Sequence, residues 1–115
     1  MLSEAEVLEA LRVCYDPELR VNIVDMGRVQ SVHVAVDTEA PGNDRRVKVT
    51  VDLLPREEQQ DAMLSALITN RLLGIYQISR TTVNLLEEPA WSPERMSDAA
   101  RRELSKQRGL IQLGN

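Results

Sequence analysis

Apolar residues near the start of the chain recur at spacings of three and four, which is the pattern of an amphipathic helix. This stripe contains Val7, Leu8, Leu11, Cys14 and Tyr15. Before it, Ser3-Glu4-Ala5-Glu6 matches the capping box, in which the Ser and Glu side chains satisfy unpaired backbone amides. The pattern therefore predicts a first helix that begins at the capping box and runs until Pro17, which cannot continue a helix.

The period of the apolar residues then changes to two, as in strands with one buried face. From Val29 onward, the inward positions are Val32, Val34 and Val36. After a loop over residues 38–44, which holds Pro41 and Gly42, the inward positions are Val47, Val49, Val51 and Leu53. Two such strands joined by a short loop predict an antiparallel hairpin.

The second half of the chain predicts a helix, a strand and a further helix. The helix spans residues 57–73, with a stripe of Met63, Leu64, Leu67, Ile68 and Leu72 and with Gly74 as C-cap. The strand lies within residues 75–86 and places Thr81, Val83 and Leu85 on one face. After a break over residues 87–93, the last helix carries Met96, Ala100, Leu104 and Gln107 and ends near Gly109. Its start is either Ser92 with Pro93 or Ser97 with Asp98.

The order of elements is helix, strand, strand, helix, strand, helix. It predicts an α+β fold with a small mixed three-stranded sheet. With 115 residues, 43% of them hydrophobic, the chain suits one domain with a modest core. We expect a single domain over residues 1–115, with its core at about residues 3–104 and a C-terminal helix and tail over residues 93–115.

Composition narrows the classes of function. A net charge of -4 and an aromatic content of 3% disfavour a nucleic-acid partner, since the chain offers neither a basic field nor a stacking surface. No window approaches the roughly 18 consecutive apolar residues of a membrane span. The acidic amino terminus also lacks the apolar region of a signal peptide, so we expect a cytoplasmic protein without a membrane partner. The one cysteine excludes an intrachain disulfide and a four-thiolate site within one chain.

Topology is expected to bring three irregular segments together. If the hairpin is antiparallel and the strand-helix-strand unit is a parallel crossover, residues 16–27, 54–60 and 87–93 lie at the same end of the sheet. The carboxyl ends of parallel strands are a favoured binding edge. The carboxylates expected at this end are Asp16, Glu18, Asp25, Glu57, Glu58, Glu87 and Glu88. The predicted partner-binding residues are Asp16, Glu18, Asn22, Asp25, Glu57 and Trp91.

Three short stretches of sequence resemble a known family. They are Asp16-Pro17-Glu18-Leu19, the run Val-Asn-Ile-Val-Asp-Met-Gly from Val21 to Gly27, and the run from Pro89 to Arg101 that begins Pro-Ala-Trp-Ser-Pro. In this order and at these intervals, the chain resembles the MIP18 family, once catalogued as a domain of unknown function and associated with iron-sulfur protein maturation. The family includes Suf-type bacterial assembly factors and the phenylacetate-degradation accessory protein. The resemblance covers about residues 7–104.

The resemblance implies an accessory or carrier role in delivering iron-sulfur clusters to apo-proteins. It also implies a fold shared with the C-terminal domain of NifU-type scaffolds. The family's cysteine lies in a turn directly after the second strand, where this sequence has Glu57. Glu87 and Ala90 likewise replace a tryptophan and a proline around the family's Pro-Pro-Trp motif. Because a carboxylate is a poorer iron ligand than a thiolate, we expect this chain alone to hold no metal or cofactor.

Several side chains have two interpretations, and the sequence favours the structural one in each case. Cys14 is a small core residue or a replacement cluster ligand. His33 is a solvated strand residue rather than a catalytic one, because no partner constellation accompanies it. The carboxylates cap helices and turns or hold a divalent ion. Trp91 is a lid over the last helix or an exposed anchor for a partner.

The leading hypothesis is a non-enzymatic accessory or adaptor protein of iron-sulfur cluster assembly, which docks apo-protein clients or assembly proteins. One alternative is a protein-interaction or regulatory module without a metal role. Another is an enzyme that uses Asp16, Asp25 or Glu57 with a divalent ion, although no nucleophile-base pair or phosphate-binding glycine loop supports it. The edge strands of so small a sheet also favour a homodimer.

Overall fold

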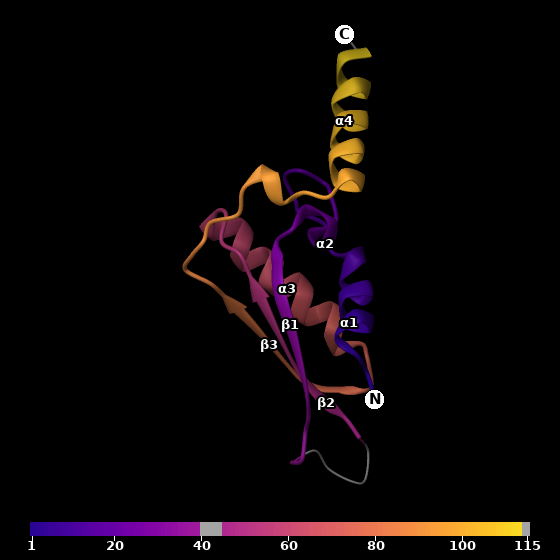
Figure 1. Cartoon of the computed structure of the whole chain (residues 1–115), viewed down its shortest axis with the longest axis vertical. Coiled ribbons are helices and arrows are strands. Elements are labelled where there is room, and N and C mark those ends of the chain that lie inside the picture. The colour runs from indigo at the N-terminus through magenta and orange to yellow at the C-terminus, as the bar shows by residue number, and fades with distance from the viewer. Residues whose placement is uncertain (40–44, 114–115) are drawn as a thin grey trace.

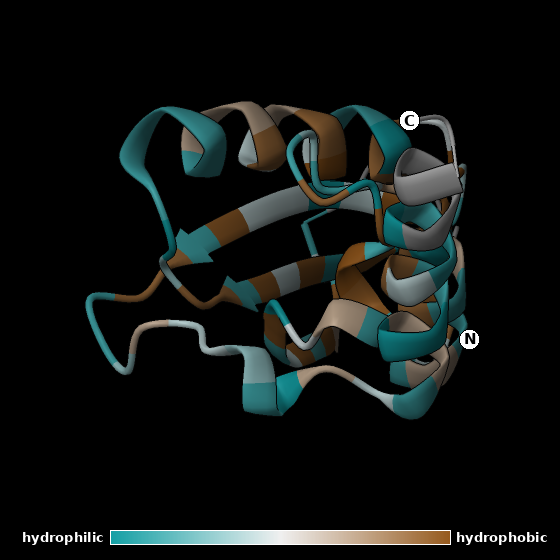
Figure 2. Ribbon diagram, turned by 90° about the horizontal axis from the view of Figure 1, so that it is seen from above, coloured by the Kyte–Doolittle hydropathy of each residue, from teal (hydrophilic) through white to brown (hydrophobic). Residues whose placement is uncertain are grey.

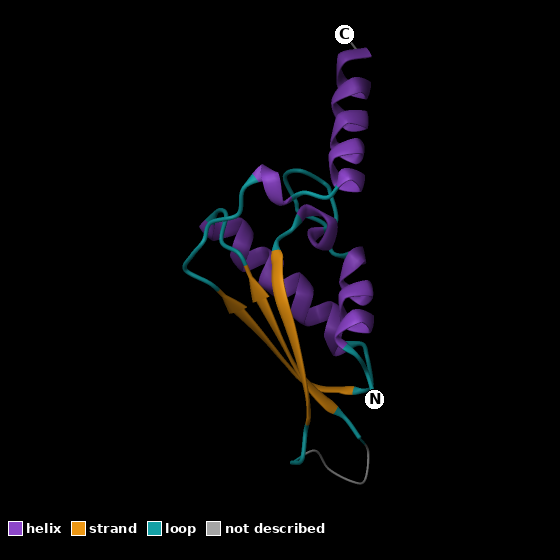
Figure 3. Cartoon of the chain, viewed as in Figure 1, coloured by secondary structure: helices purple, strands orange, loops and turns teal. Residues whose placement is uncertain are grey.

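The chain folds into three strands and a set of long and short helices, and the structure, a computed structural model, describes residues 1–39 and 45–113. The elements are α1 (Glu4–Ala10), η1 (Leu11–Val13), α2 (Ile23–Met26), β1 (Val29–Val36), β2 (Val47–Leu53), α3 (Glu58–Leu73), β3 (Ile78–Leu85), η2 (Pro93–Arg95) and α4 (Asp98–Leu113). The α+β class and the order of the main elements are confirmed (Figure 3). The short helices α2, η1 and η2 are additional to the prediction.

The strands form one mixed sheet in the order β1-β2-β3. Strand β1 pairs antiparallel with β2, with Val34 opposite Val49. Strand β3 pairs parallel with β2, with Val83 opposite Val51. The predicted hairpin and parallel crossover are therefore both confirmed (Figure 1). The predicted loop residues Pro41 and Gly42 lie outside the described residues.

The main hydrophobic core lies between one face of the sheet and the helices α1 and α3. All four predicted inward positions of β2 are buried, with at most 1% of their surface exposed. They pack in one cluster with Val7 and Leu11 from the first helical segment and with Leu64, Ile68 and Leu72 from α3. Figure 2 shows hydrophobic (brown) segments both in the sheet and in the helices beside it. Burial of a continuous apolar face on each element is what fixes the sheet register.

Helix α4 extends away from the sheet and its covering helices (Figure 1), and the molecule measures 59 × 26 × 21 Å. A second, smaller hydrophobic cluster holds the base of this helix. It contains Val21, Met26 and Ala100, with Leu19, Trp91, Met96 and Leu104 partly buried around them. Within residues 1–39 and 45–113, none of the helices has the length and apolar character that crossing a membrane requires.

The first helix ends earlier than predicted. The capping box of Ser3 and Glu6 is present, but α1 gives way to η1 after Ala10, and Cys14 is already extended. The backbone carbonyl of Cys14 accepts from Ile23 N at 2.9 Å, and Tyr15 forms a β-bridge with Asn22. This local pairing replaces a last helical turn. Tyr15, predicted as part of the apolar stripe, is 52% exposed as a result.

The predicted faces of three other elements differ from the structure at particular residues. On α3, Met63 and Leu67 are exposed, and the buried polar residue Asp61 takes a place on the inner face. Val36 and Leu85, the last residues of β1 and β3, are also exposed. The periodicity of each element predicts which face these residues lie on, but not whether that face is buried at their position.

The last helix begins at one of its two predicted starts and differs from the prediction at its C-terminal end. Both predicted starts exist, since Pro93 begins η2 and the Ser97 hydroxyl accepts from Ala100 N at 3.1 Å at the start of α4. The helix passes through Gly109 and continues to Leu113. A glycine inside a helix costs about 1 kcal/mol relative to alanine, which is too little to end a helix by itself.

Candidate functional site

The three irregular segments do meet at one end of the sheet, which we call the pole (residues 16–27, 54–60 and 87–93). Leu54 N donates to the carbonyl of Arg28 at 2.8 Å, directly after the first segment. Trp91 N donates to Pro55 O at 2.8 Å, and Trp91 Nε1 donates to Met26 O at 2.7 Å. Hydrogen bonds to backbone carbonyls, one of them from the Trp91 side chain, therefore join the segments at one end of the sheet, as the topology predicted.

A buried charge cluster lies beneath the pole. The guanidinium of Arg28 is fully buried and donates to Leu54 O at 3.1 Å and to Asp16 Oδ2 at 3.3 Å, as well as to Asp61. Asp61 also accepts from the backbone amide of Arg56 at 2.9 Å. No buried side-chain nitrogen or oxygen in the described ranges lacks a hydrogen-bond partner. One arginine thus connects β1, the Asp16 turn, the end of β2 and α3.

Asp16 shapes the pole from inside. Its Oδ1 accepts from the backbone amides of Glu18 and Leu19 at 2.9 and 2.8 Å, while its Oδ2 faces Arg28. Only 1% of Asp16 is exposed. It therefore organises the turn and offers almost no surface of its own, and its predicted role in partner binding stays a prediction. The turn closes at Arg20, which adopts a positive φ of 58°.

Glu18 lies at the surface above this turn. Its carboxylate accepts from Gln60 Nε2 at 2.7 Å and from Arg56 Nη2 at 3.1 Å. These two contacts, that of Gln60 first, lower the pKa of Glu18. Glu18 therefore joins the first segment to the start of α3 while its side chain stays 53% exposed.

Asn22 and Asp25 build the short helix α2. The Asn22 carbonyl oxygen accepts from Asp25 N at 2.9 Å, and its amide donates to Asp25 Oδ2 at 2.8 Å. Arg12 donates to the other oxygen of Asp25 at 2.5 Å. The Asn22 amide and the Arg12 guanidinium lower the pKa of Asp25. Helix α2 ends at Gly27, whose φ of 83° is the left-handed conformation that favours glycine.

Glu57 is the N-cap of α3, although capping by Ser, Thr, Asp or Asn is more usual. Its carboxylate accepts from Gln59 N at 3.3 Å and from Gln60 N at 2.9 Å. Glu87 and Glu88 lie exposed on the opposite segment. In the part of the chain that the structure describes, no three His, Cys, Asp or Glu side chains are grouped so that they could hold a metal ion. Asp16, Glu18, Asp25 and Glu57 instead accept hydrogen bonds from arginines and amides of the chain.

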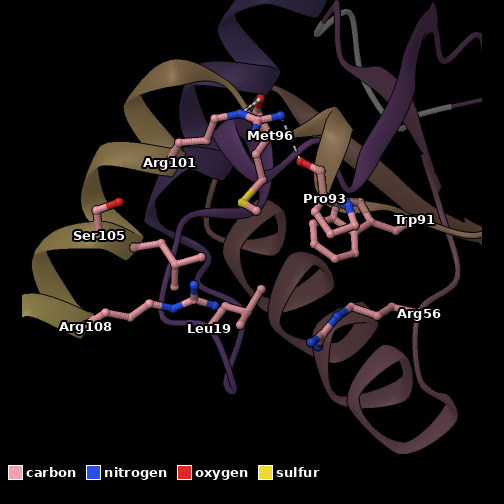
Figure 4. A pocket seen from close by; sticks show the side chains of 9 residues that line it. Leu19, Arg56, Trp91, Pro93, Met96, Arg101, Ser105 and Arg108 are labelled. Atoms are coloured by element: carbon pink, nitrogen blue, oxygen red, sulfur yellow. Dashed lines mark hydrogen bonds between the residues drawn. The ribbon is translucent and has the colours of Figure 1, made fainter. Parts of the chain in front are cut away.

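Trp91 is packed against the pole and also keeps part of its ring at the surface. Its indole N–H is bound to Met26 O, and the guanidinium carbon of Arg56 lies 5.5 Å from its ring centroid. The ring is nevertheless only partly buried and lines a groove of about 400 Å³ between the pole and α4 (Figure 4). Leu19, Met96 and Leu104 line the same groove.

Arg28, Asp61 and Arg56 organise the pole, and sequence reasoning missed all three. One signal for Asp61 is present in the sequence, because it lies three residues before Leu64 on the buried face of α3. A carboxylate on an apolar stripe requires a buried cation as partner. Arg28, next to Gly27 and directly before an apolar strand, is such a cation.

The sequence also matches a described protein family. Residues 4–71, more than half of the chain, match the family described as iron-sulfur cluster assembly protein. The chain belongs to this family. The matched residues contain α1, the turn of Asp16, the sheet hairpin and most of α3, so they include two of the three segments of the pole.

Relatives of known name and structure agree with this family. The chain is 29% identical over 103 residues to an Fe-S protein maturation auxiliary factor from Porphyromonas gingivalis, covering 89% of this chain and 90% of the relative. A DUF59 domain from Bacillus anthracis is 25% identical with a TM-score of 0.67, covering 89% of this chain and 91% of that chain. A conserved hypothetical protein from Thermotoga maritima is 25% identical with a TM-score of 0.63, covering 89% and 93%.

The thiol and the carboxylate of this family member do not fit the ligation of an iron-sulfur cluster. Cys14 is 5% exposed, and its Sγ lies 4.0 Å from Leu67 O inside the core. Burial raises the pKa of the Cys14 thiol, which disfavours the thiolate that a cluster requires. The carboxylate of Glu57 caps α3. His33 lies on the exposed face of the sheet, with Nε2 2.9 Å from Asp52 Oδ2.

Proposed function

We propose that this family member is a non-enzymatic accessory protein of iron-sulfur protein maturation, which acts by binding an assembly protein or an apo-protein client at the pole. The observation that carries the proposal is the construction of the pole itself. In this iron-sulfur assembly family member, the buried Arg28 joins the first two segments, and Trp91 joins the third segment to both of them beside a groove. Such rigid presentation of a partly exposed aromatic residue suits protein docking.

The state of the pole carboxylates supports docking over metal-dependent catalysis. Asp16 is buried against Arg28, Asp25 is bound by Asn22 and Arg12, and Glu57 caps a helix. A carboxylate that already accepts two or more hydrogen bonds would have to exchange them for a metal ion or a reacting proton. Of the predicted contact residues, Glu18, Asn22, Asp25, Glu57 and Trp91 retain exposed surface toward a partner.

The role in maturation is tested by deleting the gene in the native host. We expect lower activity of a host iron-sulfur enzyme such as aconitase at unchanged enzyme abundance. The wild-type gene and Cys14→Ala are expected to restore the activity equally, because the proposal gives Cys14 only a place in the core. Unchanged enzyme activity after deletion would refute the role in maturation. Failure of an abundant, folded Cys14→Ala protein to rescue would refute the structural role of this thiol.

The absence of a carrier function is tested by anaerobic reconstitution with iron and sulfide. We expect the parent protein to show no stable charge-transfer bands in the visible spectrum. Glu57→Cys restores a thiolate at the family position and serves as the comparison. Stable bands in the parent that disappear in Cys14→Ala would show that the chain itself carries a cluster.

A further inference from the structure

The groove beside Trp91 is apolar at its base. Leu19, Trp91, Met96 and Leu104 line it, and all four are only partly buried, unlike the fully packed residues of the sheet core. They come from the Asp16 turn, the segment around η2 and the first turns of α4 (Figure 4). Its volume of about 400 Å³ is within the usual range of ligand pockets. Apolar side chains of an incoming segment would gain free energy by covering this surface.

Three arginines surround this apolar base. Arg56 lines the groove from the segment that precedes α3, and it forms ion pairs with Glu18 and Asp16. Arg101 donates to the neutral carbonyls of Met96 and Pro93 at 3.3 and 3.2 Å, so these contacts leave its charge unbalanced. Figure 4 shows its guanidinium at the edge of the groove.

Arg108 is the third arginine, and its side chain extends from α4 toward Leu19 in Figure 4. It forms no ion pair with any residue in the described ranges 1–39 and 45–113. A protein of net charge -4 therefore presents a local positive field around one apolar groove. Glu94 is the acidic neighbour on the η2 side. Its pKa is lowered by a hydrogen bond with Ser92 and by the charge of the nearby Arg101.

We propose that this groove binds a short acidic segment of a partner protein, with one apolar side chain against Trp91 and Leu104 and with flanking carboxylates on Arg101 and Arg108. The proposal rests on the docking function above and adds the chemistry of the partner. Arginine suits carboxylates because its planar guanidinium donates two parallel hydrogen bonds. Recognition of acidic motifs by arginine clusters is a recurring mode of peptide binding.

The overall charge of the chain favours a short peptide over a large polyanion. A nucleic acid or an anionic membrane would meet the net negative field of the whole protein as well as these three arginines. A short peptide places its few charges only at the groove, within a Debye length of about 8 Å. The apolar base has no role in binding phosphate groups, but it accommodates a leucine or methionine side chain.

Trp91 is the only tryptophan of the chain, so its fluorescence reports directly on the groove. The probe is a short synthetic peptide with a central leucine flanked by aspartates, titrated into the full-length protein. Its two controls replace the aspartates by asparagines or by lysines. We expect the aspartate peptide to cause saturable quenching or a spectral shift of the fluorescence. The asparagine peptide should bind about tenfold or more weakly, and the lysine peptide should not bind. Rising salt should weaken the binding.

Two matched variants locate the site. Arg108→Glu should weaken binding of the aspartate peptide at least about tenfold, since it reverses a charge that binds the carboxylates. Arg102→Glu makes the same charge change on the same helix, but Arg102 does not line the groove. The affinity of this variant for the aspartate peptide should therefore stay within about twofold of the wild-type affinity. Leu104→Gln should weaken binding while leaving the salt dependence unchanged. Equal affinity for the aspartate and asparagine peptides, or equal effects of both arginine variants, would overturn the proposal.

The deletion strain separates this proposal from the docking function on which it rests. If the groove serves docking, Arg108→Glu should fail to restore iron-sulfur enzyme activity, whereas Arg102→Glu should restore it. Full rescue by an abundant Arg108→Glu protein would overturn the groove proposal and leave the maturation role intact. A strain in which deletion itself has no effect would refute the maturation role independently of peptide binding.

Discussion

Replacement of Arg28 by methionine is the most direct test of how the pole is held together. Methionine keeps much of the length of the side chain but removes its charge and its hydrogen-bond donors. Asp16 and Asp61 would then be left buried, with 1% and 2% of their surface exposed and without their shared cation. The carbonyl of Leu54 would also lose the donor at 3.1 Å.

The expected cost is large because unpaired charges are retained in the interior. Removing one partner of a buried ion pair typically destabilises a protein by about 3–5 kcal/mol. The free energy of unfolding of a chain of 115 residues is on the order of 6–17 kcal/mol. Arg28→Met should therefore remove between about a fifth and most of the stability and lower the melting temperature by roughly 10–20 °C.

Urea unfolding followed by circular dichroism measures this cost. Arg12→Met is the matched control, since Arg12 pairs with Asp25 at a site where its side chain is 41% exposed, and such pairs contribute about 0–1 kcal/mol. The triple variant Arg28→Met, Asp16→Asn and Asp61→Asn should recover much of the loss, because it leaves no buried charge. A cost of Arg28→Met equal to that of Arg12→Met would refute the view that this cluster holds the Asp16 turn against the end of β2 and α3.

Three further predictions concern single residues of the pole and the core. Gly27→Ala should lower the free energy of unfolding by at least about 2 kcal/mol, since φ is 83° and the added Cβ would lie 2.5 Å from Arg95 O. Gly74→Ala should leave stability unchanged, because its added Cβ would lie 3.6 Å from Arg71 O. The pKa of Asp25 is lowered in the folded protein, so its ionised carboxylate stabilises the fold at pH values above the pKa that Asp25 has in the unfolded chain. This stabilisation is lost as the pH falls below about 4, and the acid unfolding of Asp25→Asn should lack this component. Cys14 should react slowly with a thiol reagent at neutral pH in the folded protein and rapidly in urea, because burial raises its pKa and covers its sulfur. Rapid labelling of the folded protein, or identical effects of the two glycine variants, would contradict these structural assignments.

The regular elements can be predicted from the sequence because a single preference, such as hydrophobic periodicity or local capping, determines each of them and no other interaction opposes it. Strand β2 alternates strictly, and its inward valines are buried on a face fully covered by helices. The capping box at Ser3 forms as expected, since both of its hydrogen bonds are local. The convergence of the three segments follows from strand directions alone.

The details of the pole depend instead on contacts between distant residues. The pairing of Arg28 with Asp61 spans 33 positions, so periodicity within α3 cannot reveal which residue Asp61 contacts. Because Asp61 has a buried partner, it occupies the inner face, and Met63 and Leu67 remain outside. Similarly, the early end of the first helix reflects the bridge of Tyr15 with Asn22, which no local propensity contains.

The arginines beneath the pole and around the groove divide into two groups, one that contributes to stability and one that is proposed to contribute to binding. Arg28 is buried and bound by carboxylates of the chain itself, whereas Arg108 is exposed and without an ion pair in the described ranges. Arg28→Met should therefore lower the unfolding free energy and, through disorder of the Asp16 turn, also weaken binding of the aspartate peptide. Arg108→Glu should weaken the same binding at an unchanged urea midpoint. If Arg108→Glu were as destabilising as Arg28→Met, the arginines around the groove would be structural, and an acidic partner would no longer follow from them.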